Sequence, residues 1–332
     1  MKNIKEINPE NLLYNLSKFD GKKICAMVKA NAYGHGMKEI VSLLKDKAEM
    51  FGVSSVEEGK IVRKFCENPI FVVAKTDEFK LCKKYNLDVI VEDENDIKNV
   101  AKYDINCHVK INCGMNRYGV KTPLSAKILN DALNEYDIRP MSIFTHFSKT
   151  DDAFVTKKEY QNFLRLKSNF DNDIPICFGG SGIYDYDFDF DILRLGIGLY
   201  GYEREALKPV LQIKSFVKKV FYAKAGEFVG YDNGFLVRKK GYFAIVPIGY
   251  ADGLMRNLSN KFCVEINSKK YRAIGKICMD CFFVEVDESV SVKDEVIVMK
   301  NADYLAKSAK TISYEILTNF SKLRGETKIL SE

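Results

Sequence analysis

The sequence predicts an α/β protein, a (β/α)8 TIM-like barrel followed by a mostly-β C-terminal domain. Two observations carry this prediction: short apolar runs alternate with helical patterns in the first part of the chain, and the alternation stops near Leu207. Apolar strands that alternate with helices are typical of a parallel sheet, and about eight such units can close into a barrel. With 332 residues and 46% hydrophobic content, the chain is large enough for more than one domain.

The runs expected to form the barrel strands are nearly continuous apolar stretches, rich in Val and Ile. They are Ile24–Ala30, Met50–Ser54, Ile70–Ala74, Leu87–Val91, Cys107–Ile111, Met141–His146, Ile174–Phe178 and Ile192–Tyr200. Between them lie charged stretches with apolar residues at helical spacing. The clearest of these stretches are Met37–Lys47, Val56–Cys66, Glu94–Tyr103, Pro123–Asn134 and Val155–Asn169.

After Leu207, strand-like runs are separated by turn signals such as Asp232-Asn233-Gly234, and only Tyr304–Leu317 has a helical pattern. The strand-like runs are Val210–Ala223, Gly241–Gly249, Phe262–Ile266, Tyr271–Cys278, Phe282–Val286 and Glu295–Met299. We therefore predict a barrel over residues 1–205 and a mostly-β domain over residues 206–332.

Composition argues against several classes of protein. The formal charge is +6, but the 51 basic and 45 acidic residues are interspersed, so we expect no nucleic-acid partner. No apolar stretch follows the N-terminus or approaches the length of a membrane span, so we expect neither a signal peptide nor a membrane partner. The 9 Cys lack the spacing of a disulfide framework, which indicates reduced thiols and a cytoplasmic location.

The pair Cys278 and Cys281 has the spacing of a redox motif, but a strand-like run follows it. Redox pairs of this kind begin a helix, whose dipole lowers the thiol pKa. We therefore interpret these two as structural cysteines. No cluster of side chains has metal-ligand spacing, so we predict no metal site.

Polar residues lie at the ends of several predicted strands, where barrel enzymes place their chemistry. Lys29, Lys110, His146 and Arg194 end or interrupt apolar runs. A lysine in an apolar run is costly to bury. Burial would lower the pKa of Lys29 and free its amine as a nucleophile. The alternative is that Lys29 extends to the barrel rim and stays in contact with water. Glycines after the seventh and eighth runs suggest a phosphate-binding loop. The pattern G-x-G-x-x-G at Gly196–Gly201 lacks a following helix, which argues against a dinucleotide site.

The run Val28–Gly36 resembles the pyridoxal-phosphate signature of the alanine racemase family. Further segments follow in the order of the family, and the resemblance covers nearly the whole chain. These segments are His108–Arg117, Thr145–Phe147, Arg194–Ile197, Gly249–Gly253, Cys278–Asp280 and Tyr314–Glu315. The resemblance implies pyridoxal 5'-phosphate as cofactor, and a homodimer in which each active site borrows residues from the partner's β domain.

The resemblance also implies the catalytic pair. Lys29 would hold the cofactor and act as one acid/base, and Tyr250 of the other subunit would act on the opposite face of the substrate Cα. Because a single base would mostly return the proton to the same side, racemisation needs both groups. Free Lys and Tyr titrate near 10, so each needs an environment that lowers its pKa. His146 is the expected hydrogen-bond neighbour of Tyr250.

The other site residues follow from the same resemblance. Arg194 would face the pyridine nitrogen of the cofactor. Because a guanidinium is always charged, it does not readily give that nitrogen a proton. The ring is then a poorer electron sink, which would curb side reactions. Arg117 would contact the cofactor's phenolic oxygen and the substrate carboxylate, and Met279 of the partner chain would help form the wall near that carboxylate. Lys110 matches a lysine that is often carbamylated. The phosphate-binding set would be Tyr33, Ser181, Gly196, Ile197 and Tyr314.

The chain departs from the family at four places. Gly180 replaces an Asn, Leu195 replaces a Pro, Asn112 replaces an Asp, and Ser321–Glu326 is an altered form of the Arg-rich ending. These changes leave the details of the phosphate site, the dimer contacts and the substrate range open, while Lys29 and Tyr250 are both retained.

The predicted function is the interconversion of L- and D-alanine, which supplies D-alanine for peptidoglycan. One alternative is a racemase of broader specificity that also takes serine, because the same two bases would serve. A decarboxylase of the same cofactor class fits the Tyr250 segment poorly. Another alternative is a non-catalytic pyridoxal-phosphate protein, for which a complete β domain would have no evident use.

Overall fold

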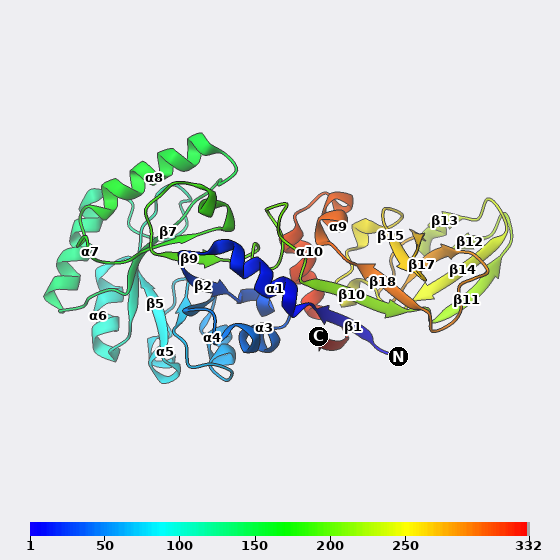
Figure 1. The fold of residues 1–332 in the computed structure, drawn as a ribbon, viewed down its shortest axis with the longest axis horizontal. Helices are drawn as coiled ribbons and strands as arrows, with labels where there is room; N and C mark the ends of the chain where they lie inside the picture. Colours follow the sequence, from blue (N-terminus) through cyan, green and yellow to red (C-terminus); the bar gives the residue numbers. More distant parts are fainter. Residues whose placement is uncertain (331–332) are drawn as a thin grey trace.

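The computed structural model describes residues 1–330, so residues 331–332 of the predicted second domain lie outside the described part. The molecule is elongated, with a barrel at one end and a β-rich part at the other (Figure 1). The helix α10 (Ser313–Asn319) lies at the junction of the two.

The barrel closes from eight parallel strands in the order of the sequence. They are β2 (Lys23–Met27), β3 (Met50–Val53), β4 (Ile70–Val72), β5 (Leu87–Val91), β6 (Cys107–Lys110), β7 (Ser142–His146), β8 (Ile176–Gly179) and β9 (Ile192–Leu195). Each falls on one of the predicted apolar runs, and β9 pairs with β2 to close the ring. The predicted fold class is confirmed.

Helices cover the outside of the barrel (Figure 1). They are α1 (Pro9–Leu16), α3 (Met37–Leu44), α4 (Val56–Val62), α5 (Phe79–Tyr85), α6 (Glu94–Tyr103), α7 (Pro123–Glu135) and α8 (Ala153–Lys167). Side chains of Ser55, Asp93, Thr122 and Asp152 accept backbone N–H groups at the helix starts, which satisfies donors that would otherwise lack partners. The short helices α1 and α5 were not among the predicted helices.

The β-rich part is built on a nine-stranded sheet in the order β11-β14-β17-β16-β15-β18-β10-β1-β19. Its strands are β1 (Asn3–Ile7), β10 (Leu211–Phe216), β11 (Lys219–Ala223), β14 (Gly241–Val246), β15 (Cys263–Ile266), β16 (Lys269–Ile274), β17 (Phe282–Val286), β18 (Glu295–Met299) and β19 (Gly325–Ile329). The N-terminal strand β1 pairs with β10 and β19, so the chain starts in this sheet, forms the barrel and then returns. A domain boundary after residue 205 stays a prediction.

A small two-stranded sheet and one further α-helix complete this part. The small sheet pairs β12 (Phe228–Val229) with β13 (Phe235–Leu236), and α9 (Ala302–Ala309) precedes α10. The predicted helical stretch Tyr304–Leu317 therefore contains two helices with a break between them.

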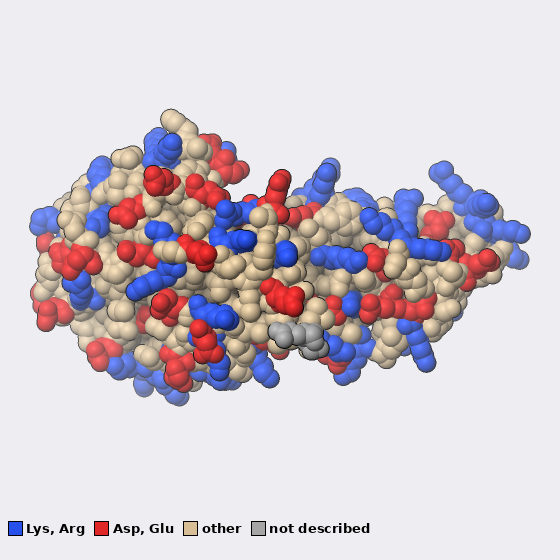
Figure 2. All heavy atoms as spheres, viewed as in Figure 1, with Lys and Arg blue, Asp and Glu red and all other residues tan. Residues whose placement is uncertain are grey.

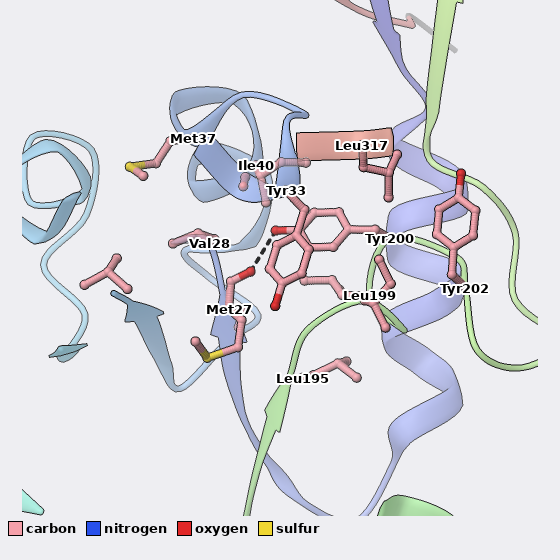
Figure 3. Close-up of a cluster of buried hydrophobic side chains, with 14 of the residues drawn as sticks. Met27, Val28, Tyr33, Met37, Ile40, Leu195, Leu199, Tyr200, Tyr202 and Leu317 are labelled. Carbon is pink, nitrogen blue, oxygen red and sulfur yellow. Dashed lines mark hydrogen bonds between the residues drawn. The ribbon is translucent and has the colours of Figure 1, made fainter. Parts of the chain in front are cut away.

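A buried aromatic cluster joins the barrel to α10. The rings of Tyr33 and Tyr200 lie 4.9 Å apart, and the Tyr200 hydroxyl donates to the backbone oxygen of Met27 at 2.8 Å (Figure 3). A Cβ at Gly34 would lie 2.0 Å from the backbone oxygen of Leu317, so only glycine lets α10 approach this closely. This contact brings α10 to the barrel mouth.

On the face drawn in Figure 2, basic and acidic groups are interspersed over the barrel. Within residues 1–330, no helix combines the length and the apolar character needed to cross a membrane.

Candidate active site

A cavity of about 230 Å³ opens at the C-terminal ends of the barrel strands. Every site residue predicted from the sequence lines it, except Tyr250 and Met279. These lining residues are Lys29, Tyr33, Lys110, Arg117, His146, Ser181, Arg194, Gly196, Ile197 and Tyr314. Tyr314 reaches the cavity from α10, together with Thr318, so the C-terminal helix closes one side of the barrel mouth.

Lys29 begins a strained left-handed turn. The element α2 (Lys29–Tyr33) has φ values between 51° and 54° at its last four residues, a conformation that costs about 1–2 kcal/mol per residue. Glu58 of α4 offsets this cost, because its carboxylate accepts the backbone N–H of Ala30 at 2.7 Å. The Asn31 side chain accepts the N–H of Met37 at 2.8 Å at the other end. Sequence reasoning did not find Glu58, since no local pattern predicts a left-handed turn.

The surroundings of Lys29 favour its neutral amine. Burial lowers the pKa of Lys29, and the nearby positive charges of Arg117 and Arg194 lower it further. A neutral primary amine is the form that attacks an aldehyde or accepts a proton.

Arg194 and His146 lie side by side across a glycine. The guanidinium donates to the backbone oxygen of Thr145 at 2.6 Å and to that of Cys177 at 3.2 Å. A Cβ at Gly179 would lie 2.2 Å from Arg194 Nη2 and 2.6 Å from His146 Nδ1, so no larger residue fits there. Burial and the Arg194 charge hold the pKa of His146 well below its usual value, so its imidazole is neutral at pH 7.

Lys110 is buried at the end of β6. Its ammonium donates to the backbone oxygen of Ile111 at 3.0 Å and lies 4.9 Å from the ring centre of Phe144. Burial and the Arg194 charge lower the pKa of Lys110 to about 7. This lysine is therefore partly neutral under physiological conditions, as modification of its amine would require.

Hydroxyl groups and glycines lie on the side of the cavity that follows β8 and β9. The Ser181 hydroxyl accepts the N–H of Gly198 at 2.8 Å, and Gly180 has a φ of 110° that favours glycine. A Cβ at Gly196 would lie 2.7 Å from the Tyr33 hydroxyl. Gly180, which replaces an Asn of the family, thus lies where the backbone itself forms the wall of the cavity.

These residues fit pyridoxal phosphate. The amine of Lys29, which tends to be neutral, suits the cofactor's aldehyde, and the guanidinium of Arg194 suits its ring nitrogen. The hydroxyl groups and the backbone N–H groups at the glycines suit its phosphate.

Tyr250 and Met279 lie on the β-rich part, away from this cavity. Their segments are joined by two backbone hydrogen bonds, from Tyr250 N–H to Cys278 O and from Ala251 N–H to Met279 O, both at 3.0 Å. The two residues are 42% and 53% exposed, respectively. They are therefore held next to each other and presented to solvent.

The altered C-terminus supports this exposed pair. Arg324 donates to both carboxylate oxygens of Asp252 at 2.8 and 2.9 Å and pairs with Asp280 at 2.8 Å. Asp252 is fully buried and also accepts the N–H of Gly249 at 2.9 Å. One guanidinium thus ties the segment of Tyr250 to the segment of Met279.

Comparisons with known proteins agree with this geometry. Residues 7–204 match the family described as "Alanine racemase, N-terminal domain", and residues 210–327 match "Alanine racemase, C-terminal domain". The chain belongs to the alanine racemase family. The alanine racemase of Borreliella burgdorferi (strain ZS7) is 33% identical, with 95% of this chain and 94% of the relative covered. That of Aquifex aeolicus (strain VF5) is 31% identical, with 96% and 97% covered.

A solved structure is similar over the whole fold. The alanine racemase of Clostridium difficile 630 superposes with a TM-score of 0.91 at 28% identity, covering 99% of this chain and 96% of that one. The family predicted from the signature around Lys29 is therefore confirmed, and pyridoxal phosphate is the cofactor of the alanine racemase family.

Proposed function

We propose that this chain racemises alanine at the barrel mouth with two bases, Lys29 and the Tyr250 of a second copy of the chain. One observation carries the proposal: the cavity contains the predicted cofactor and substrate residues, while Tyr250 and Met279 are exposed together elsewhere. We infer that a second copy of the chain supplies the base that this cavity lacks. Relatives that are 31–33% identical are alanine racemases, which favours alanine over serine.

The cofactor would be held at three points. Lys29 Nζ would bind it covalently, the Arg194 guanidinium would face its ring nitrogen, and the phosphate would receive hydrogen bonds from Tyr33, Ser181 and Tyr314 and from the backbone at Gly196 and Ile197. When bound, pyridoxal phosphate supplies an electron-withdrawing ring that acidifies the α-hydrogen of the amino acid.

The two bases work from opposite faces. With its lowered pKa, the Lys29 amine can take a proton from Cα on one face and return it there. The Tyr250 hydroxyl would exchange a proton on the other face. The cations that line the cavity, among them Arg117 and Arg194, would lie near this hydroxyl after docking and would favour the transfer of its proton. Inversion follows when one group removes the proton and the other supplies it.

The remaining residues would select and orient the substrate. Arg117 lines the cavity and can pair with the substrate carboxylate, and the partner's Met279 would form the wall beside it. A wall at this place leaves room for a small side chain such as that of alanine.

Assembly and location complete the proposal. We infer a homodimer in which each β-rich part covers the barrel mouth of the other subunit, and a cytoplasmic enzyme that supplies D-alanine for peptidoglycan. In a dimer of this kind, the exposed Tyr250 and Met279 would be buried against the partner's cavity.

The first experiment compares wild type with Tyr250→Phe. Purified protein with added pyridoxal phosphate is given L-alanine in deuterated water, and both α-deuterium exchange and D-alanine are followed. We expect inversion to fall about 100-fold or more in the variant, because general acid/base catalysis contributes that much, while the cofactor absorbance is kept. The exposed Tyr242 provides a matched control, since Tyr242→Phe should invert alanine at the wild-type rate.

Other results would contradict the proposal. Wild-type inversion by Tyr250→Phe would exclude the second base. Cofactor absorbance with inversion of serine alone would indicate a broader or different racemase. Absorbance without exchange for any amino acid would indicate a non-catalytic binding protein.

A further inference from the structure

An acidic residue adjoins the hydroxyls assigned to phosphate binding. Glu203 follows β9 and the buried Tyr202, and its carboxylate accepts the proton of the Tyr314 hydroxyl. Partial burial raises the pKa of the Glu203 carboxyl, and the hydrogen bond from Tyr314 opposes that rise. One of the three hydroxyls proposed for the phosphate therefore already has an anionic partner.

Tyr314 lines two cavities. One is the active-site cavity, and the other is an outer cavity that Glu203 also lines. A phenol has a single proton to donate. While an ionised Glu203 accepts that proton, Tyr314 can present only its oxygen lone pairs to a phosphate, and these repel it.

The cation next to this carboxylate in the chain already has a partner. The neighbouring Arg204 pairs with Asp185 at 2.8 Å and lies over the ring of Phe19. Within residues 1–330, the ion pairs of this region do not include Glu203. Its φ of 73° is left-handed, so the chain holds the side chain at this place against a local conformational preference.

We propose that Glu203 is a negative determinant of cofactor affinity, a carboxylate that competes with the cofactor's phosphate for the hydroxyl proton of Tyr314. The proposal rests on the proposed function, since it takes the phosphate to lie beside this hydroxyl. Binding of the phosphate then requires Glu203 to turn into the outer cavity or to take up a proton. The protein should hold pyridoxal phosphate more weakly than its set of hydroxyl donors would allow.

The test is equilibrium dialysis of the cofactor-free protein against pyridoxal phosphate, for wild type and Glu203→Gln. A glutamine amide can donate to the Tyr314 oxygen, which leaves the phenol proton for the phosphate, and it removes the negative charge. We expect binding to tighten about tenfold, the effect of one hydrogen bond to a charged group. Glu205→Gln is the matched control, because Glu205 lines the same outer cavity while the Tyr314 hydroxyl donates to Glu203, and it should bind as wild type does.

Binding of pyridoxal, which lacks the phosphate, distinguishes an effect on the phosphate from an effect on the whole cofactor. Glu203→Gln should leave the affinity for pyridoxal unchanged, and inorganic phosphate should compete with pyridoxal phosphate more strongly in the variant than in wild type. In a Tyr314→Phe background, the benefit of Glu203→Gln should largely disappear, because the shared hydroxyl is gone.

Equal affinities of wild type and Glu203→Gln for pyridoxal phosphate would overturn the proposal. An equal gain for pyridoxal and for pyridoxal phosphate would overturn it as well, because Glu203 would then act on something other than the phosphate. These affinities are measured without turnover. A protein that binds as expected but does not invert alanine would contradict the proposed function while supporting this role of Glu203.

Discussion

The cavity concentrates positive charge around one neutral imidazole. Lys29, Lys110, Arg117 and Arg194 all line it, and His146 among them stays neutral because it is buried and because protonation would add another cation. Such a group of basic side chains suits a ligand with two anionic ends, a phosphate and a carboxylate. Burial and the same repulsion lower the pKa of each lysine, so the site that attracts the ligand also prepares the amines for chemistry.

The lowered pKa of Lys110 makes a prediction about its modification. With a pKa of about 7, about half of the Lys110 amine is neutral at pH 7, whereas an ordinary lysine is almost fully charged. The neutral nitrogen can attack the carbon of CO2 and lose a proton, which gives a carbamate anion able to pair with Arg117. We expect native mass spectra in bicarbonate buffer to contain one added CO2 per chain, increasingly so as the pH rises through 7.

The control for this prediction is Lys110→Arg, which keeps a positive charge but has no amine to react. An added CO2 that persists in this variant would assign the modification to another lysine. A wild-type spectrum without the adduct on both sides of pH 7 would show that Lys110 stays unmodified.

At the scale of the element, the left-handed turn after β2 depends on one side chain of a neighbouring helix. Glu58 accepts the N–H of Ala30 at 2.7 Å and the N–H and hydroxyl of Ser54, each at 2.8 Å. We expect Glu58→Ala to lower the free energy of unfolding by about 2 kcal/mol, the value of hydrogen bonds to a charged group. It should also weaken cofactor binding, because Lys29 and Tyr33 are at the two ends of the turn.

Urea denaturation of the cofactor-free protein measures the first effect. Glu57→Ala is the matched control: Glu57 forms only an exposed pair with Lys60, so its loss should change the free energy of unfolding little. Equal destabilisation by the two variants would mean that Glu58 acts only as a negative charge in the first turn of α4 and does not support the left-handed turn.

Much of the element pattern could be predicted because it is local. Each barrel strand coincides with an apolar run, since strands buried on both faces must be apolar along their length. The left-handed turn could not be predicted, because Ala30 and Ala32 carry no signal for positive φ and the stabilising Glu58 is distant in sequence. The pairing of β1 with β19 was missed for the same reason: it joins the two ends of the chain.

The residues of the candidate site also differ in whether they belong to a local sequence pattern. Residues within recognisable segments, such as Lys29 and Arg194, were found from the sequence and line the cavity. Glu203 and Arg324 were missed as site residues, because their partners Tyr314 and Asp252 become neighbours only in the folded chain. Sequence resemblance names the groups that act, while the contacts that tune or hold them depend on the tertiary structure.

At the scale of the whole molecule, the separation of Tyr250 from Lys29 makes a prediction about shared sites. Neither Lys29→Ala nor Tyr250→Phe should invert alanine alone. In a mixed dimer of the two variants, one site would combine an intact Lys29 with the intact Tyr250 of the other subunit. Unfolding and refolding the two together in equal amounts should therefore restore about a quarter of the wild-type activity, since half of the dimers are mixed and each has one complete site.

Each variant refolded by itself is the control and should stay inactive. Size-exclusion chromatography of the mixture shows whether dimers have formed, so that failed assembly is not mistaken for failed complementation. Mixed dimers without activity would mean that Tyr250 acts on its own barrel or not at all. Since Tyr250 is 42% exposed and lies away from the cavity in one chain, activity restored only by mixing would require that the second base comes from the partner.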